Sequence, residues 1–236
     1  MSLRAMLLSN STQHGRGYLD HAIEELRDHL SGVRRLAFVP FALNDHAAYG
    51  AKVRDRLAPL GIEVAVVPAD GRALRALEEA EAIFVGGGNT FRLLHRMIAT
   101  GLVAAIRREV FAGKPYVGAS AGTVVGGPTI RTTNDMPIVH PETLDALALV
   151  PFQINCHYLD ADPASTHMGE TRETRLREFH EENETPVVGL REGAWIRVAG
   201  DRATLRGTTG ARLFVRGDAP RELAAGADLG GLCPRR

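Results

Sequence analysis

The stretch Tyr116-Val117-Gly118-Ala119-Ser120-Ala121-Gly122 places a serine between two glycines, after an apolar run and before small residues that favour a helix start. This is the sequence form of a nucleophile elbow, a strand-to-helix turn in which the serine backbone is strained and glycines avoid collisions. Such a turn exposes the Ser120 hydroxyl and leaves the N–H of Ala121 at a helix N-terminus, where it stabilises an oxyanion. The stretch predicts a serine hydrolase, although the same motif also occurs in turns without chemistry.

Outward from this turn, short apolar runs alternate with amphipathic segments, which is typical of βαβ units around a parallel sheet. The expected strands are residues 5–8, 36–40, 62–67, 82–85 and the run before Ser120. The expected helices are residues 18–30, 47–60, 74–79, 91–99, 102–112 and, after the turn, 171–182. A further strand is expected at 187–190, and residues 194–198 and 203–205 predict a C-terminal hairpin. We therefore expect one α/β domain over residues 1–236, with a mainly parallel sheet flanked by helices.

Composition excludes several classes of function. The 236 residues carry 28 Lys plus Arg and 28 Asp plus Glu, so the formal charge is zero and there is no global field for nucleic acid or an anionic membrane. The two cysteines, Cys156 and Cys233, are far apart and form neither a disulfide framework nor a zinc motif. The N-terminal apolar run is too short for a signal peptide, and no stretch is long enough to span a bilayer. We expect a protein of the reducing cytoplasm.

A reactive serine needs a base, and His157 is the best placed of the nine histidines because it follows the strand-like run Phe152-Gln153-Ile154-Asn155-Cys156. The carboxyl ends of strands are where this architecture collects its chemistry. His140 and His167 lie in loops and remain alternatives. The other six are expected at the surface: His14, His21, His29, His46, His95 and His180.

The glycine-rich run Gly86-Gly87-Gly88-Asn89-Thr90 follows the fourth strand and lacks the spacing of a phosphate-binding loop. Glycine here lets the backbone approach a substrate, so we expect the N–H of Gly88 to complete an oxyanion hole with that of Ala121. Residues 126–156 form a long irregular passage, and a loop of that length in a compact domain is typically functional.

Several motifs together resemble the peptidase E family of aspartyl dipeptidases, also called alpha-aspartyl dipeptidases. They are Leu8 to Thr12 (LSNST), Gly86 to Phe91 (GGGNTF), Gly118 to Gly122 (GASAG), Pro128 to Val139 (PTIRTTNDMPIV), Gln153 to Asn155 before His157, Gly169 to Arg172 (GETR) and Gly189-Leu190 before Glu192-Gly193. The resemblance implies a fold like that of class I glutamine amidotransferases and cleavage of dipeptides with N-terminal aspartate, without cofactor or metal. It also implies Ser120 as nucleophile and His157 as base, with either Asp135 or Glu192 as the acid that orients the imidazole.

An acidic substrate side chain calls for an arginine, whose planar fork holds a carboxylate with two hydrogen bonds. Arg131 and Arg172 lie within the family-like motifs, and the resemblance favours Arg172; Asn89 is a further candidate for substrate binding. The sequence departs from the family pattern at three positions: Ala119 replaces a bulky aromatic residue, Cys156 a proline and His140 an acidic residue.

Two other functions remain open at this stage. One is a related serine peptidase of the cyanophycinase type, which acts on β-linked aspartyl chains. The other is a sensor or binding module that keeps the fold without turnover. The expected partner is a small peptide substrate, and the expected assembly is a monomer or a homodimer.

Overall fold

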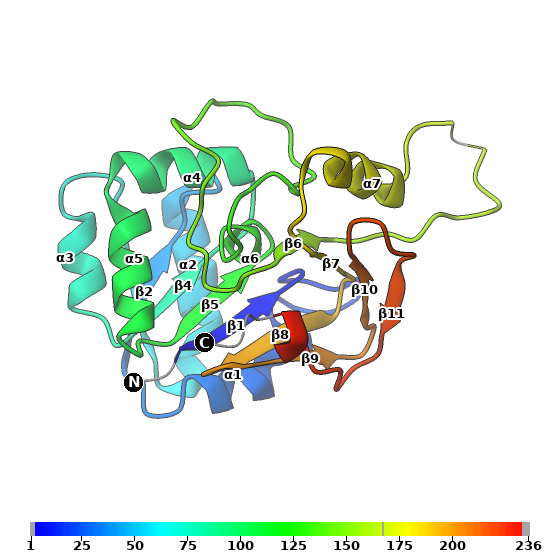
Figure 1. The fold of residues 1–236 in the computed structure, drawn as a ribbon. Coiled ribbons are helices and arrows are strands. Elements are labelled where there is room, and N and C mark those ends of the chain that lie inside the picture. The colour runs from blue at the N-terminus through cyan, green and yellow to red at the C-terminus, as the bar shows by residue number, and fades with distance from the viewer. Residues whose placement is uncertain (1–2, 167, 233–236) are drawn as a thin grey trace.

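The computed structural model describes residues 3–166 and 168–232. Its larger sheet has seven strands in the order β3-β2-β4-β5-β1-β8-β9 (Figure 1). The five strands from β3 to β1 are parallel, and β8 and β9 add an antiparallel hairpin at one edge. The strands are β1 (Arg4–Leu8), β2 (Arg35–Val39), β3 (Glu63–Val66), β4 (Ala82–Val85), β5 (Tyr116–Ala119), β8 (Ala194–Ala199) and β9 (Arg202–Gly207). The predicted mainly parallel α/β fold with a C-terminal hairpin is confirmed.

Helices cover both faces of this sheet because successive side chains of a strand point to opposite sides. In β1, Ala5 and Leu7 belong to one hydrophobic cluster, whereas Met6 and Leu8 belong to the other. The first cluster includes buried residues of α3 (Ala73–Glu78), α4 (Thr90–Ala99) and α5 (Leu102–Phe111), and the second includes residues of α1 (Ile23–His29) and α2 (His46–Leu57). The short helix α6 (Ala121–Val124) follows β5 directly.

A second sheet of four strands has the order β11-β10-β7-β6, and Figure 1 shows it beside α7 at one end of the molecule. Its members are β6 (Gln153–Cys156), β7 (Val187–Leu190), β10 (Ala211–Phe214) and β11 (Arg221–Leu223), with α7 spanning Arg172–Glu182. The adjacent strands β6 and β7 are parallel. The sequence pattern does not predict β10 or β11, because both strands are short and carry no long apolar run. Both sheets contribute to the larger core cluster.

Two predicted helices have different ends in the structure. Residues 18–30 do not form one helix, since Leu19 adopts the left-handed conformation (φ 60°) and a 3-10 turn, η1 (Asp20–Ala22), precedes α1. Helix α2 ends at Leu57 and continues only as the 3-10 turn η2 (Ala58–Leu60), which contains Pro59. A third 3-10 turn, η3, spans Gly230–Leu232.

The expectation that His29 and His180 lie at the surface is wrong, because both side chains are buried. The Nε2 of His29 donates to the carbonyl oxygen of Tyr116 in β5 at 2.9 Å. Burial lowers the pKa of His29 to about 3, and nearby arginines act in the same direction. His29 is therefore a neutral core residue.

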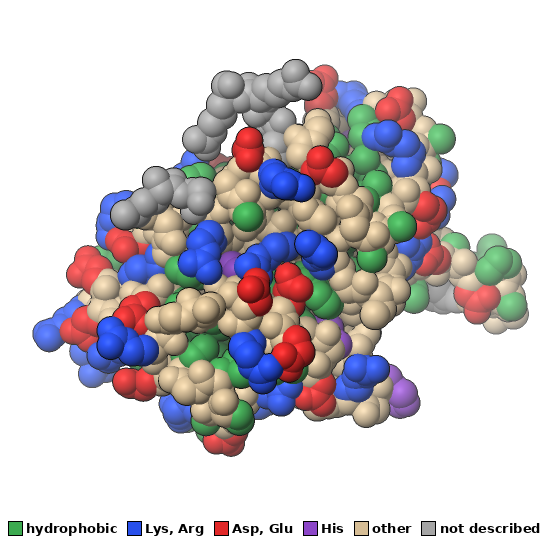
Figure 2. Space-filling view, turned by 90° about the horizontal axis from the view of Figure 1, so that it is seen from below, with side chains coloured by type: hydrophobic (Ala, Val, Ile, Leu, Met, Phe, Trp, Pro, Cys, Tyr) green, Lys and Arg blue, Asp and Glu red, His purple; other side chains and the backbone are tan. Residues whose placement is uncertain are grey.

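Charged side chains of both signs are interspersed over the face drawn in Figure 2, in keeping with the zero formal charge. Within residues 3–166 and 168–232, no helix is long and apolar enough to cross a membrane. In the same part of the chain, no group of three or more His, Cys, Asp or Glu side chains is arranged to hold a metal ion. Cys233 and His167 lie outside the described residues.

Candidate active site

Ser120 occupies a strained turn between β5 and α6. Its backbone has φ 52° and ψ −112°, a positive φ that is uncommon for a residue other than glycine. Space around the turn is minimal: a Cβ added at Gly118 would lie 2.5 Å from the carbonyl oxygen of Gly122, and one added at Gly122 would collide with the carbonyl oxygen of Val85. The structure thus forms the tight strand-to-helix turn expected from the two glycines.

An imidazole and a carboxylate extend from Ser120 in one hydrogen-bonded line. The Ser120 Oγ is 2.9 Å from Nε2 of His157, and Nδ1 of His157 is 2.6 Å from Oε1 of Glu192. His157 directly follows β6 and Glu192 lies two residues after β7. These strands are parallel neighbours, with Cys156 opposite Leu190, so their carboxyl ends bring the two side chains together.

Ser120 comes from the larger sheet, and the other two side chains come from the smaller one. The site therefore requires a fixed position of one sheet relative to the other. Ser9, fully buried just after β1, performs this connection. Its Oγ donates to the carbonyl oxygen of Leu190 at 2.7 Å and accepts from the backbone N–H of His157 at 2.9 Å. The next residue, Asn10, accepts from the N–H of Gly193 at 2.9 Å.

Ser9 and Asn10 were not predicted as site residues from the sequence. The available signal was their position, because two polar residues directly follow a buried apolar strand on the side of the sheet where chemistry collects.

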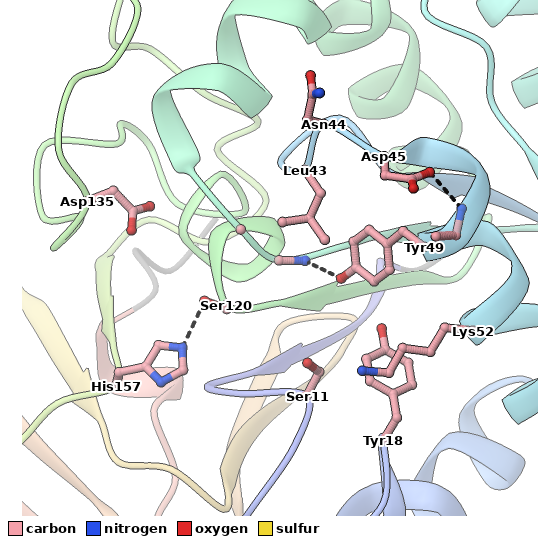
Figure 3. A pocket seen from close by; sticks show the side chains of 13 residues that line it. Ser11, Tyr18, Leu43, Asn44, Asp45, Tyr49, Lys52, Ser120, Asp135 and His157 are labelled. Carbon is pink, nitrogen blue, oxygen red and sulfur yellow. Dashed lines mark hydrogen bonds between the residues drawn. The ribbon is translucent and has the colours of Figure 1, made fainter.

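Asp135 lies apart from the Ser–His–Glu line, on the wall of the pocket (Figure 3). One oxygen of its carboxylate accepts from the N–H and the Oγ1 of Thr90, at 2.7 and 2.6 Å, and from Thr133 Oγ1 at 3.2 Å. Thr90 is the first residue of α4, so the carboxylate sits at the positive end of that helix. Within the described part of the chain, no hydrogen bond joins Asp135 to His157.

The irregular passage that carries Asp135 is docked along β6. Thr132 Oγ1 donates to the carbonyl oxygen of Ile154, Asn134 Nδ2 donates to that of Cys156, and Asn155 Nδ2 donates to that of Thr132. These contacts give a long loop a fixed conformation next to the strand that ends at His157.

The glycine-rich loop lies directly against the elbow. A Cβ added at Gly87 would be 3.0 Å from Cβ of Ser120, and the N–H of Gly87 donates to the Tyr49 hydroxyl at 2.9 Å. Gly88 lines the pocket beside Ser120 with φ 133°, and a Cβ there would lie 2.7 Å from the carbonyl oxygen of Ala42. The N–H of Gly87 donates to Tyr49, whereas the N–H of Gly88 has no acceptor among the described residues. The Gly88 N–H is therefore free to donate a hydrogen bond to a bound substrate.

The three predicted substrate-binding residues lie in different surroundings. Asn89 caps α4: its Oδ1 accepts from the N–H of Arg92 at 3.0 Å and its Nδ2 donates to the carbonyl oxygen of Met136 at 2.9 Å. Both ends of the amide are thus engaged by protein. Arg131 is exposed and does not line the pocket.

Arg172 begins α7 and is only partly exposed. Burial lowers the pKa of its guanidinium, as does Arg175 to a smaller extent, whereas the charge of Asp135 acts in the opposite direction. Among the described residues Arg172 has no ion pair. Like Arg131, Arg172 is not among the residues that line the pocket. Its positive charge nevertheless lies within electrostatic range of Asp135.

Cys156 does not compete with Ser120 as a nucleophile. Its thiol is buried and contacts the carbonyl oxygen of Ser120 at 3.5 Å. Burial raises the pKa of the thiol, with Asp135 contributing in the same direction, so the thiolate is disfavoured. His140, the loop histidine left open by the sequence, is exposed and does not line the pocket.

A pocket of about 780 Å³ opens beside Ser120, and Figure 3 shows Ser120 and His157 at its wall.

Comparisons with known proteins agree with the geometry of the site. Residues 5–206 match the model of Peptidase family S51. Over 227 residues the chain is 61% identical to a protein named "Peptidase E" from Streptomyces coelicolor, covering 96% of this chain and 93% of the relative.

Two further comparisons extend over almost the whole chain. A Drosophila melanogaster protein named "Probable alpha-aspartyl dipeptidase" is 50% identical over 227 residues, which is 95% of each chain. The crystal structure of a peptidase from an acI-B1 Actinobacterium superposes with a TM-score of 0.71 over 97% of both chains at 17% sequence identity, a likeness of fold.

Proposed function

The chain belongs to peptidase family S51, and we propose that it is a serine dipeptidase that hydrolyses dipeptides with an N-terminal aspartate. The predicted resemblance to the peptidase E family is confirmed by this membership and by relatives named Peptidase E and alpha-aspartyl dipeptidase. The observation that carries the mechanism is the line of hydrogen bonds from Ser120 through His157 to Glu192.

In the proposed reaction, Ser120 Oγ attacks the carbonyl carbon of the N-terminal aspartyl residue while His157 Nε2 takes the hydroxyl proton. The developing oxyanion is held by the N–H groups of Gly88 and Ala121. The imidazolium then gives its proton to the leaving amine, the C–N bond breaks and an aspartyl ester of Ser120 remains. Water, deprotonated by His157, hydrolyses this ester and releases aspartate.

Glu192 is the proposed acid of the triad. It accepts from Nδ1 of His157 at 2.6 Å, which fixes the tautomer that leaves Nε2 free to accept the serine proton and stabilises the imidazolium that forms. Asp135 has a different proposed role. Its carboxylate lines the pocket without reaching His157, and a substrate with a free N-terminus brings an ammonium group that needs such an acceptor.

Arg172 is the proposed partner of the substrate's side-chain carboxylate. It has no counter-ion in the described part of the chain, and its charge interacts with that of Asp135. An aspartyl residue carries an ammonium and a carboxylate a few bonds apart, so a neighbouring acid and arginine match both of its charges. Arg131 and Asn89 have less support, since one is exposed and the other caps a helix.

A panel of Asp-Leu, Leu-Asp, β-Asp-Arg and a neutral dipeptide tests this function. Wild-type enzyme should cleave Asp-Leu, and Ser120→Ala should cleave none. Preferred cleavage of β-Asp-Arg would indicate the cyanophycinase-type activity, and no cleavage of any peptide would indicate a binding module. The intact Ser–His–Glu geometry favours an enzyme over the latter.

Arg172→Ala should reduce hydrolysis of Asp-Leu far more than any residual hydrolysis of a neutral dipeptide. The matched control is Arg177→Ala on the same helix, because Arg177 is exposed and paired with Glu173. Equal losses on both substrates would contradict a role of Arg172 in binding the side-chain carboxylate.

We also propose that the enzyme acts in the cytoplasm, where a free thiol such as that of Cys156 stays reduced. Fractionation of cells that express the protein would test this location. A monomer or homodimer stays the predicted assembly.

A further inference from the structure

The pocket continues past the catalytic residues to a second charged end (Figure 3). In that view, Asp135 and His157 lie on one side of Ser120, while Tyr18 and Lys52 lie on the other. This second end is formed by α2, by the loop that precedes it and by the segment after β1. A peptide bound with its scissile carbonyl at Ser120 would therefore direct one of its two halves toward Lys52.

Lys52 carries an uncompensated positive charge. Its Nζ lies 4.6 Å from the centroid of the Tyr18 ring, a cation–π contact that holds the ammonium without neutralising it. Within residues 3–166 and 168–232, no carboxylate forms an ion pair with it. The acid in this part of the pocket, Asp45, accepts from the N–H of Ala48 at 2.9 Å and caps α2.

The path from Ser120 to Lys52 suits a short peptide. Leu43 and the largely buried Tyr49 line it, giving an apolar wall for side chains, and Tyr18 forms the far part. The pocket volume of about 780 Å³ lies within the range of roughly 300–1,000 Å³ that is typical of sites for small ligands. Each additional residue extends a bound peptide by about 3.5 Å.

The direction in which a peptide lies in the pocket follows from the function proposed above. Arg172 and Asp135 are assigned to the aspartyl residue that acylates Ser120, so the leaving portion occupies the opposite side. That portion always begins with the amine that His157 protonates, and in an unmodified peptide it ends with a carboxylate. A lysine at the far end of the leaving-group side is complementary to that carboxylate.

We propose, resting on the aspartyl peptidase function above, that Lys52 selects peptides whose leaving portion ends in a free carboxylate. The apolar wall formed by Leu43 and Tyr49 receives the side chains of that portion. Lys52 is remote from the bonds that change, so it strengthens binding of substrate and transition state alike and acts on KM more than on kcat.

The test compares each peptide acid with its C-terminal amide. Substrates are Asp-Leu, Asp-Leu-Gly and Asp-Leu-Gly-Gly, each as acid and amide, with kcat/KM measured for wild type, Lys52→Met and Lys52→Arg. Methionine keeps the packing of the lysine stem on Tyr18 and removes the charge. Using the acid-to-amide ratio within each variant cancels any general change in activity.

For at least one length, wild type should prefer the acid by roughly fivefold, the size of a favourable solvent-accessible ion pair. The ratio should fall to about one in Lys52→Met, stay near the wild-type value in Lys52→Arg and lose most of its size at high salt. The control is Arg54→Met, which removes a charge from α2 outside the pocket lining and should keep the wild-type ratio.

A wild-type ratio of one at every length, or an unchanged ratio in Lys52→Met, would overturn the role of Lys52. Asp-p-nitroanilide separates this failure from failure of the proposed function, because its leaving group has no carboxylate. If wild type hydrolyses this compound and Ser120→Ala does not, the peptidase function is supported, whatever the acid-to-amide ratios are. If wild type hydrolyses neither this compound nor any aspartyl peptide, the proposed function is refuted.

Discussion

Glu192→Gln offers the sharpest test of the triad, since the amide keeps the shape of the side chain and can still accept from His157 while the charge is lost. The lost interaction is that between the carboxylate and the imidazolium formed during catalysis. Two unit charges about 4 Å apart interact by about 1 kcal/mol in water and about 4 kcal/mol near a protein surface. The side chains of His157 and Glu192 are 42% and 54% exposed, so an intermediate value of about 2 kcal/mol is appropriate.

At about 1.4 kcal/mol for each factor of ten, kcat should fall roughly 30-fold. That loss is much smaller than the factor of about 10⁴ seen when a buried triad acid is replaced by its amide. Steady-state hydrolysis of Asp-Leu at saturating substrate measures the effect. Glu222→Gln is the matched control, because Glu222 forms an ion pair with Arg191, the residue before Glu192, and does not contact His157.

The parallel variant Asp135→Asn should raise KM more than it lowers kcat, as expected for a group that binds the substrate ammonium. A larger fall in kcat for Asp135→Asn than for Glu192→Gln would refute the assignment of Glu192 and return the triad acid to Asp135.

Three further predictions concern the framework of the site. Ser9→Ala should cost about 2 kcal/mol of unfolding free energy in chemical denaturation and lower kcat, because it leaves the N–H of His157 and the carbonyl of Leu190 without their buried partner; unchanged kcat would show that Ser9 does not position the histidine. Ser120→Gly should have a higher thermal midpoint than Ser120→Ala, since only glycine relieves the positive φ, and the reverse order would contradict strain at the elbow. Between pH 7 and pH 5, the unfolding free energy of wild type should fall by about 2 kcal/mol relative to that of His29→Gln, measured by chemical denaturation. The folded pKa of His29, about 3, lies below the unfolded pKa of about 6.5, so the stability that is present above the unfolded pKa is lost as the pH falls toward the folded pKa. The same pH dependence in both proteins would refute this.

The tight turn at Ser120 and the place of His157 at the end of a strand could be predicted from the sequence, because both depend on local pattern. Ser120 lies between glycines that a strand-to-helix turn requires, and His157 follows an apolar strand. The contact of His157 with Glu192 rather than with Asp135 could not be predicted from the sequence, since it depends on the pairing of β6 with β7, which places Cys156 opposite Leu190. A sequence pattern locates strands but does not say which strand lies beside which.

Other differences have equally specific causes. The burial of His29 was foreseeable, because it lies three residues after Leu26 and next to Leu30 on the apolar side of its helix. The left-handed conformation of Leu19, which delays the start of α1, has no local signal such as glycine. The place of Lys52 in the pocket could not be predicted from the sequence. It depends on the packing of α2 beside the segment after β1, two parts of the chain that are far apart in sequence.

Ser120 and His157, the proposed nucleophile and base, meet at the junction of the two sheets. Their separation of 2.9 Å is therefore also a measure of how tightly those sheets abut. A shift of about 1 Å between the two sheets would break this hydrogen bond and would cost roughly a hundredfold in rate, although no reacting group would be altered.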